Sequence, residues 1–181
     1  MQVILRLKLF AGGAHLVVSL IVAALAAMLV FGLWYPFPFG ETSGGRQLFL
    51  LLILVDVVIG PLMTILVFNH TKSRRELILD LAVIGVLQLC ALSYGLWSVF
   101  VARPVYLVYE YDRMRVVHAV DVDERQLPAA SLDFRSLPLT GPRLIALREF
   151  ENPSEKFNAT FEAMSGAMLA SRTELWSAYS T

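Results

Sequence analysis

Charged side chains are scarce in this chain of 181 residues, where they make up 17% of the total against about 25% in ordinary soluble domains. Basic and acidic residues number 15 each, so the net positive field that attracts nucleic-acid phosphates is missing. The single cysteine, Cys90, excludes an intrachain disulfide and any metal or redox motif that needs two cysteines. We also find no Gly-rich phosphate loop and no clustered acid, base and nucleophile. The sequence therefore predicts no catalytic residues, no metal site, no cofactor and no nucleic-acid partner, and we expect a protein that is not an enzyme.

The few charges are distributed unevenly along the chain. Residues 1–101 hold 10 of the 30 charged side chains, and residues 102–181 hold the other 20. A single water-soluble globule would not show this division. The sequence predicts an α-helical integral membrane protein, with a membrane domain at 1–103 and a small α+β extracytoplasmic domain at 104–181.

Three apolar stretches stand out in the first part, at about 16–35, 48–68 and 77–101. Each has roughly the 20 residues that a helix needs to cross the hydrocarbon core of a bilayer. An isolated segment in lipid must be helical to satisfy its backbone, so we predict three transmembrane helices. The first stretch could instead be a signal peptide. Its apolar run exceeds the usual signal core of about 7–15 residues, and we therefore expect an uncleaved helix.

Basic residues near the helix ends predict the orientation. Five of them lie before the first stretch or in the loop at 69–76, whereas Arg46 is alone between the first and second stretches. We expect the amino terminus and the 69–76 loop to be cytoplasmic. Three crossings then place the C-terminal domain in the periplasm of a bacterium, with the helices in the inner membrane and in contact with lipid.

Asp56 lies deep in the second stretch, where inserting a carboxylate costs about 2.5–3.5 kcal/mol. Counting outward from the centre of the following loop places Asp56 level with Gln88 or Leu89, and Gly60 level with Gly85. We expect a hydrogen bond from Gln88 to Asp56, close helix packing at the two glycines, and a kink at Pro61. Three roles for Asp56 stay open: a structural clamp with Gln88, reception of a polar group from a partner helix, and a proton relay.

The C-terminal part has the pattern of an α+β domain. Two runs rich in β-branched and aromatic residues, at 105–110 and 114–120, flank a polar turn and predict a β-hairpin. A proline-containing loop follows, with a short strand expected at 144–147.

A helix is predicted to begin after Asn152, which can cap it, with Pro153 in the first helical position. Apolar residues then recur at helical spacing toward the chain end: Phe157, Phe161, Met164, Met168, Leu175 and Tyr179. We favour packing of this stripe against the hairpin, and the alternative is a partner groove. As candidate partner contacts we single out Phe157, Phe161, Met164 and Met168.

Several blocks together resemble one family, the type IV pilin accessory proteins of the TfpX/TfpZ group. The blocks are FGLWYP at 31–36, SGGR at 43–46, VDVVIGPL at 55–62, KSRREL at 72–77, ARPVY at 102–106 and LTGPR at 139–143. The resemblance implies an inner-membrane accessory factor for type IV pilus biogenesis, with a pilin subunit as its partner and a role in pilin stability or assembly. It also leads us to expect family members that continue beyond the position of Thr181. The competing hypothesis is a membrane-anchored periplasmic sensor or assembly factor unrelated to pili. The oligomeric state is not predicted.

Overall fold

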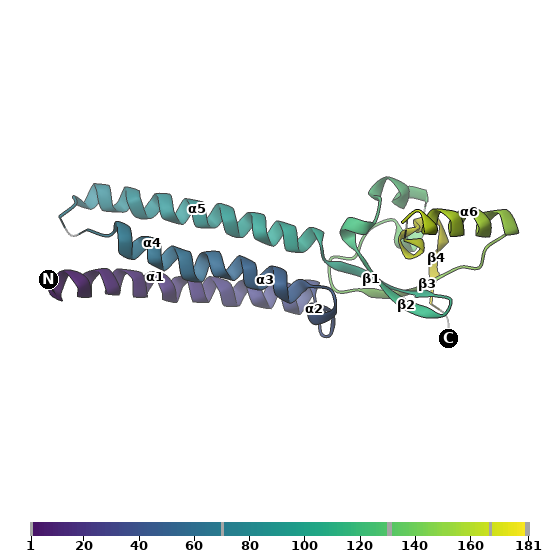
Figure 1. The fold of residues 1–181 in the computed structure, drawn as a ribbon, viewed down its shortest axis with the longest axis horizontal. Coiled ribbons are helices and arrows are strands. Elements are labelled where there is room, and N and C mark those ends of the chain that lie inside the picture. Colours follow the sequence, from purple (N-terminus) through teal and green to yellow (C-terminus); the bar gives the residue numbers. More distant parts are fainter. Residues whose placement is uncertain (1, 70, 130–131, 167, 180–181) are drawn as a thin grey trace. The chain divides into compact units, whose positions relative to one another are not determined.

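The computed structural model of the chain describes residues 2–69, 71–129, 132–166 and 168–179. Its internal contacts divide it into two units. The helical unit consists of the chain up to Gly32 together with Gly44–Phe100, and the α+β unit consists of Leu33–Ser43 together with the chain from Val101 onward. The α-helices and strands of both units are labelled in Figure 1.

Three helical segments of the described chain are long and apolar enough to cross a membrane: Leu5–Trp34, Gly45–Val67 and Arg74–Val101. The three long apolar helices expected from the sequence are therefore present. The first begins earlier than residue 16, because the flanking residues Arg6 and Lys8 are themselves good helix formers. The elements that make up these segments are α1 (Gln2–Leu29) with a π-helical turn at Val30–Trp34, α3 (Gly45–Ile53), a second π-helical turn at Leu54–Ile59, α4 (Gly60–Val67) and α5 (Arg74–Val101).

Pro61 disturbs the middle segment through the π-helical turn that precedes it. In such a turn each N–H bonds to the carbonyl five residues earlier, and the Gly60 N–H accordingly bonds to the Val55 carbonyl. The same pattern would join residue 61 to the carbonyl of Asp56, but proline has no N–H. The Asp56 carbonyl is thus left without its partner along the helix.

Glycines mark the close approaches between helices of this unit. A Cβ atom built on Gly12 of α1 would collide with Ile65 of α4, and one on Gly95 of α5 would collide with Leu52 of α3. Of α5, which the structure describes throughout, only Val99 is buried. The rest of α5 keeps an apolar surface that is available to lipid or to another protein.

The α+β unit contains a sheet of four strands in the order β2-β1-β3-β4. The expected hairpin is present, since β1 and β2 pair antiparallel around a turn in which Tyr111 adopts φ 58°. Strand β3 pairs parallel with β1, and β4 pairs antiparallel with β3. The sequence did not predict β4, nor the 3₁₀ turns in the connection from β2 to β3. The strands are β1 (Pro104–Glu110), β2 (Arg113–His118), β3 (Arg143–Leu147) and β4 (Trp176–Ala178), and the 3₁₀ turns are Ala119–Asp121, Glu124–Ala129 and Leu132–Phe134.

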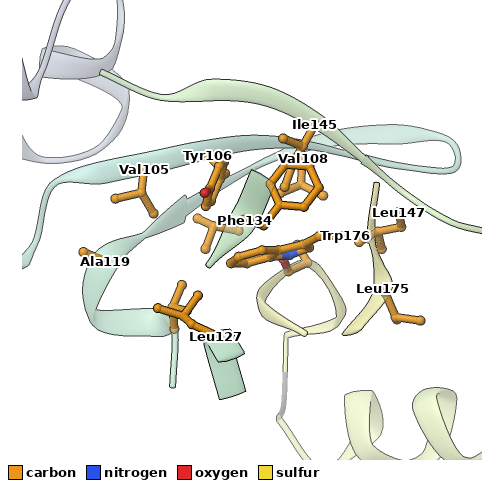
Figure 2. Packing of buried hydrophobic residues seen from close by; sticks show 13 residues of the cluster. Val105, Tyr106, Val108, Ala119, Leu127, Phe134, Ile145, Leu147, Leu175 and Trp176 are labelled. Atoms are coloured by element: carbon orange, nitrogen blue, oxygen red, sulfur yellow. The ribbon is translucent and has the colours of Figure 1, made fainter. Parts of the chain in front are cut away.

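Aromatic residues form the centre of the core of this unit. The ring centroids of Tyr106 and Trp176 lie 4.7 Å apart, and Phe134 meets both rings edge-on at 6.2 Å (Figure 2). The indole Nε1 of Trp176 donates to the Ala170 carbonyl at 2.9 Å. The unit therefore has a hydrophobic core of its own.

The segment Leu33–Ser43, which includes the short helix α2 (Phe39–Thr42), groups with the α+β unit although the apolar runs do not indicate this. The Gly141 N–H donates to the Leu33 carbonyl at 2.7 Å. Gly141 has φ 38°, and a Cβ atom there would approach Pro36 to 2.9 Å. The Trp-Tyr-Pro-Phe-Pro-Phe stretch at 34–39 is thus joined to the loop before β3.

Helix α6 (Pro153–Met164) begins as expected but is shorter than predicted. The Asn152 side chain caps it by accepting the Glu155 N–H at 2.8 Å. The helix ends at Met164, and Gly166 two residues later has φ 98°, a conformation that L side chains rarely adopt. The prediction of a helical stripe reaching Leu175 and Tyr179 was wrong. That part of the chain forms the 3₁₀ turns Leu169–Ser171 and Thr173–Leu175, followed by β4.

Candidate functional site

Asp56 is the most unusual polar residue of the helical unit. Its side chain is only 6% exposed and belongs to the π-helical turn. Within the described residues, its Oδ1 is buried and has no hydrogen-bond partner. Buried polar atoms in native proteins are nearly always hydrogen-bonded, so this oxygen calls for an explanation.

Gln88 meets Asp56 in a different way from the expected clamp. Its Nε2 donates to the backbone carbonyl of Asp56 at 3.2 Å, and not to the carboxylate. That carbonyl is the one left without a helical partner by Pro61. The bond from α5 therefore replaces the missing backbone bond of the middle segment, and within the described residues Oδ1 of the carboxylate stays without a partner.

The two glycines of the expected close pair have different surroundings. A Cβ atom on Gly60 would collide with the Gln88 amide. Because glycine has no side chain, Gln88 can approach closely enough to bond to the Asp56 carbonyl. A Cβ atom on Gly85 would meet nothing within 4 Å. The expected contact between Gly60 and Gly85 is thus replaced by one between Gly60 and Gln88, and Gly85 lines an open cavity next to them.

This cavity has a volume of about 190 Å³ and lies between α1 and α5, with Asp56 in its wall. A second hollow of about 410 Å³ shares His15 and Val18 with it and extends toward Thr64. We call the two together the α1–α5 groove. Its walls are formed by Ala11, Ala14, His15, Val18, Ser19 and Val22 of α1, by Leu81, Gly85, Gln88, Leu89 and Leu92 of α5, and by Asp56 and Thr64.

Sequence reasoning missed the contribution of α1 to this groove. The α1 residues in its wall recur at helical spacing and half of them are small, which is a detectable signal for a helix-contact face. His15 Nδ1 and Thr64 Oγ1 lie 2.6 Å apart and form a polar contact between α1 and α4. The groove therefore contains polar groups from α1, the middle segment and α5.

The apolar side chains of α6 form the second candidate surface. Phe157, Phe161 and Met164 are 69%, 61% and 83% exposed, and the two phenylalanine rings stack with their centroids 6.4 Å apart. The favoured expectation that the stripe packs against the hairpin was therefore wrong for these three residues, because Ala159 is the residue of α6 that faces inward. It holds for Leu175, which lies in the core with hairpin residues, and for Tyr179, whose ring meets Tyr109 of β1. Met168 lies beyond the helix end and does not share its face. We call Phe157, Phe161 and Met164 the α6 face.

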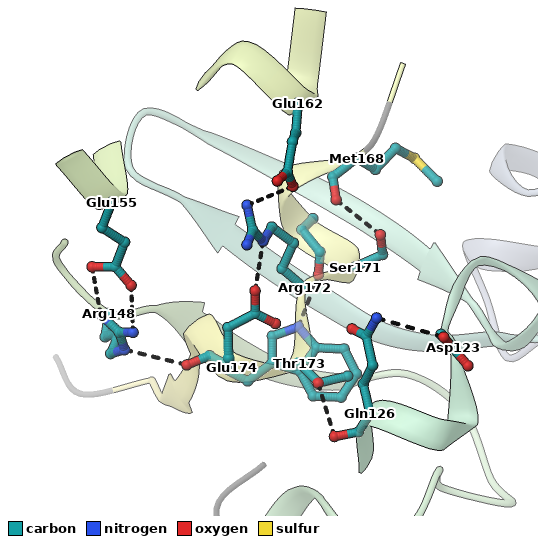
Figure 3. A network of polar contacts seen from close by, with 12 residues as sticks. Asp123, Gln126, Arg148, Glu155, Glu162, Met168, Ser171, Arg172, Thr173 and Glu174 are labelled. Atoms are coloured by element: carbon teal, nitrogen blue, oxygen red, sulfur yellow. Dashed lines mark hydrogen bonds and ion pairs between the residues drawn. The ribbon is translucent and has the colours of Figure 1, made fainter. Parts of the chain in front are cut away.

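Ion pairs hold α6 on the rest of the unit (Figure 3). The Arg148 guanidinium donates to both carboxylate oxygens of Glu155, at 2.7 and 3.3 Å, and also to the Glu174 carbonyl at 3.2 Å. Arg172 donates to Glu162 at 2.9 Å and to the Glu174 carboxylate at 2.6 Å. Hydrogen bonding to Arg148 holds the pKa of Glu155 below its usual range. The charged side of α6 is thus used for attachment, which leaves its apolar face outward.

Groups of three or more His, Cys, Asp or Glu side chains that could hold a metal ion are absent from the part of the chain that the structure describes. The one histidine of the α+β unit, His118, has its Nδ1 3.2 Å from the Asp121 carboxylate. This pair closes a capping interaction at the end of β2, since the His118 N–H also donates to Asp121.

The fold and these surfaces define a class of protein with three long apolar helices and a small α+β unit that has an exposed apolar helix face. A family model of the fimbrial assembly protein FimB matches residues 4–44. The chain is 40% and 38% identical, over 169 residues, to the fimbrial assembly proteins of serogroups I and E1 of Dichelobacter nodosus. It is 42% identical over 118 residues to the fimbrial assembly protein of serogroups C1 and C2 of the same organism. No solved structure matches the chain significantly.

The chain belongs to the family of fimbrial assembly proteins. The third alignment covers 65% of this chain and 90% of its relative, whereas the first two cover 93% of this chain. The chain spans about two thirds, 66%, of the length of those first two relatives. These matches support a fimbrial assembly protein and do not support the TfpX/TfpZ subgroup in particular.

Proposed function

We propose that this protein is an inner-membrane accessory factor for the biogenesis of type IV pili and that it binds a pilin subunit. Membership of the fimbrial assembly family supports a role in pilus assembly. Three helices of sufficient length and apolarity support the membrane location. The factor stabilises or positions the pilin and carries out no chemistry on it.

The proposed orientation has the amino terminus and the loop between α4 and α5 in the cytoplasm. Lys72, Arg74 and Arg75 of this loop, with Arg6 and Lys8 before the first apolar stretch, provide the positive charge that is retained on that side. The α+β unit then lies in the periplasm. There it can meet the globular part of a pilin whose apolar helix is still in the membrane.

The α6 face is the observation that carries the proposed contact outside the membrane. An exposed pair of stacked phenylalanines with a methionine is costly in water and is typical of an interaction surface. The ion pairs of Arg148 and Arg172 fix the helix, so its face is preorganised for a partner. We assign this face to the pilin head, and the membrane helices to protection of the pilin helix from lipid.

Photocrosslinking in living cells tests this function. A photoreactive residue at position 157 or 161 is expected to form adducts with pilin. The same residue at Val120, which is 64% exposed in the α+β unit but lies outside the α6 face, serves as the matched control and is expected to give few. Equal adduct yields at all three positions, or no pilin adduct from the α6 face, would contradict the proposal.

A deletion strain separates this function from that of a sensor unrelated to pili. We expect loss of surface pili and a lower amount of pilin in the membrane. Restoration by the wild-type chain and failure of restoration by Phe161→Glu would connect the effect to the α6 face. Unchanged piliation in the deletion strain would favour the competing function.

A further inference from the structure

The α1–α5 groove contains an acceptor that nothing in the described chain satisfies. Asp56 is only 6% exposed, and its Oδ1 has no hydrogen-bond partner among the described residues. The nearby donor Gln88 gives an N–H to the backbone carbonyl of Asp56 and makes no bond to this oxygen. His15 contacts Thr64 through Nδ1 and makes no bond to Oδ1 of Asp56. A buried acceptor of this kind is costly unless a donor arrives from outside.

The shape of the groove fits a helix as the carrier of that donor. Its α1 wall runs from Ala11 to Val22, a length of about 16 Å or three helical turns. The small side chains of Ala11, Ala14 and Ser19 would allow close approach of a second backbone. On the other side, α5 buries only Val99 and thus has apolar surface left for a partner.

The cavity next to Asp56 is large enough to admit a side chain of a partner. Its volume of about 190 Å³ exceeds several-fold the roughly 30 Å³ that one water molecule occupies in the liquid. Its wall combines the apolar side chains of Val18, Val22 and Leu92 with the carboxylate of Asp56. A side chain with an apolar stem and a hydrogen-bond-donating or cationic end is complementary to both.

We propose that the α1–α5 groove binds the membrane-spanning helix of the pilin subunit, and that a hydrogen-bond-donating or cationic group of this helix pairs with the carboxylate of Asp56. The inference rests on the proposed function and adds the place and the chemistry of the contact within the membrane. The carboxylate specifies the depth and rotation of the bound helix, because a misplaced helix leaves Asp56 unpaired. The apolar walls of the groove supply the remaining contact.

Photocrosslinking of the full-length chain in native membranes tests the groove. A photoreactive residue at Val18 or Leu89, one on each wall, is expected to form adducts with pilin. The matched control is Leu51 of α3, which is 71% exposed and outside the groove. Adducts of the groove positions with a second copy of this chain, or with lipid alone, would overturn the proposed occupant.

Substitution of Asp56 tests the chemistry. Asp56→Leu is expected to lower the pilin adduct yield from Val18 about 5- to 30-fold, the effect of one interhelical hydrogen bond measured in model peptides. Asp56→Asn keeps an acceptor oxygen and is expected to retain more adduct than Asp56→Leu. An unchanged yield in Asp56→Leu would overturn the role of the carboxylate.

A parallel measurement at Phe161 distinguishes failure of this inference from failure of the proposed function. If the α6 face forms pilin adducts and neither groove position does, the groove proposal is wrong and the function stands. If none of the positions forms a pilin adduct, both are wrong. Retained adducts at Phe161 in Asp56→Leu show that this variant is folded and inserted, so that a loss at Val18 reports on the groove.

Discussion

Trp176 offers the sharpest test of whether the α+β unit depends on the core described above. Its side chain is 4% exposed, its ring contacts Tyr106 and Phe134, and its Nε1 donates to the buried Ala170 carbonyl at 2.9 Å. Trp176→Ala removes all of these contacts and leaves a cavity, a change that costs about 3–5 kcal/mol in protein cores. Trp176→Phe keeps most of the packing but leaves the Ala170 carbonyl unpaired, at about 1–3 kcal/mol.

These magnitudes are large in comparison with the stability of the unit. Its roughly 90 residues correspond to about 5–13 kcal/mol of unfolding free energy at the usual value per residue. We therefore expect Trp176→Ala to lower the unfolding midpoint strongly and Trp176→Phe to lie between it and the wild type.

The assay is thermal unfolding of the purified full-length chain in detergent, with amide hydrogen exchange of β1 and β3 as the local measurement. Phe157→Ala is the matched control, because Phe157 is 69% exposed and surface changes usually stay within about 0.5 kcal/mol. If Trp176→Ala unfolded at the wild-type temperature and protected β1 equally, the core assigned to this unit would be refuted.

Two further predictions concern the attachment of α6 and the loop before β3. Because the folded-state pKa of Glu155 is lowered, its contribution to stability is complete above the ordinary Glu pKa of about 4.3 and is lost as the pH falls through the lowered value. Glu155→Gln should thus lower the unfolding midpoint near pH 7, and this difference should vanish in acid; a difference that persisted there would contradict the Arg148 pairing. Gly141→Ala should destabilise the α+β unit by at least about 1–2 kcal/mol, since φ is 38° and the added Cβ would crowd Pro36. Gly13→Ala, with open space around the site, should not, and equal unfolding midpoints for the two variants would argue against this account of the loop.

The sequence was most informative where a pattern extends over many residues. Long apolar runs predict the three helices, since their length and composition leave few alternatives. Runs rich in β-branched and aromatic residues on both sides of a polar turn predict the hairpin formed by β1 and β2. The cap formed by Asn152 likewise marks the true start of α6.

Prediction failed where a contact between distant segments decides the structure. The spacing of Leu175 and Tyr179 fits a helix. In the structure, however, Leu175 and Trp176 are buried in the core, and Trp176 begins β4, which pairs with β3. These positions form a strand and not a helix because they pair with β3, about 30 residues earlier in the chain. A local sequence pattern cannot reveal such a distant pairing.

The candidate site shows the same limit at Asp56. Its burial and its nearness to Gln88 follow from the depth of both residues in the apolar runs. The atom that receives the Gln88 bond depends on the π-helical turn and on the missing N–H of Pro61, which the apolar pattern does not reveal. That Oδ1 of Asp56 has no hydrogen-bond partner among the described residues is therefore a finding of the structure.

Binding of pilin is the central claim of this account, and copurification tests it most directly. The tagged full-length chain is purified from detergent-solubilised membranes of cells that produce pilin, and the bound proteins are identified. We predict that pilin copurifies with the wild-type chain and is depleted from preparations of Phe161→Glu and Asp56→Leu that unfold at the wild-type temperature. Absence of pilin from the wild-type preparation, or its equal recovery with all three chains, would contradict the account.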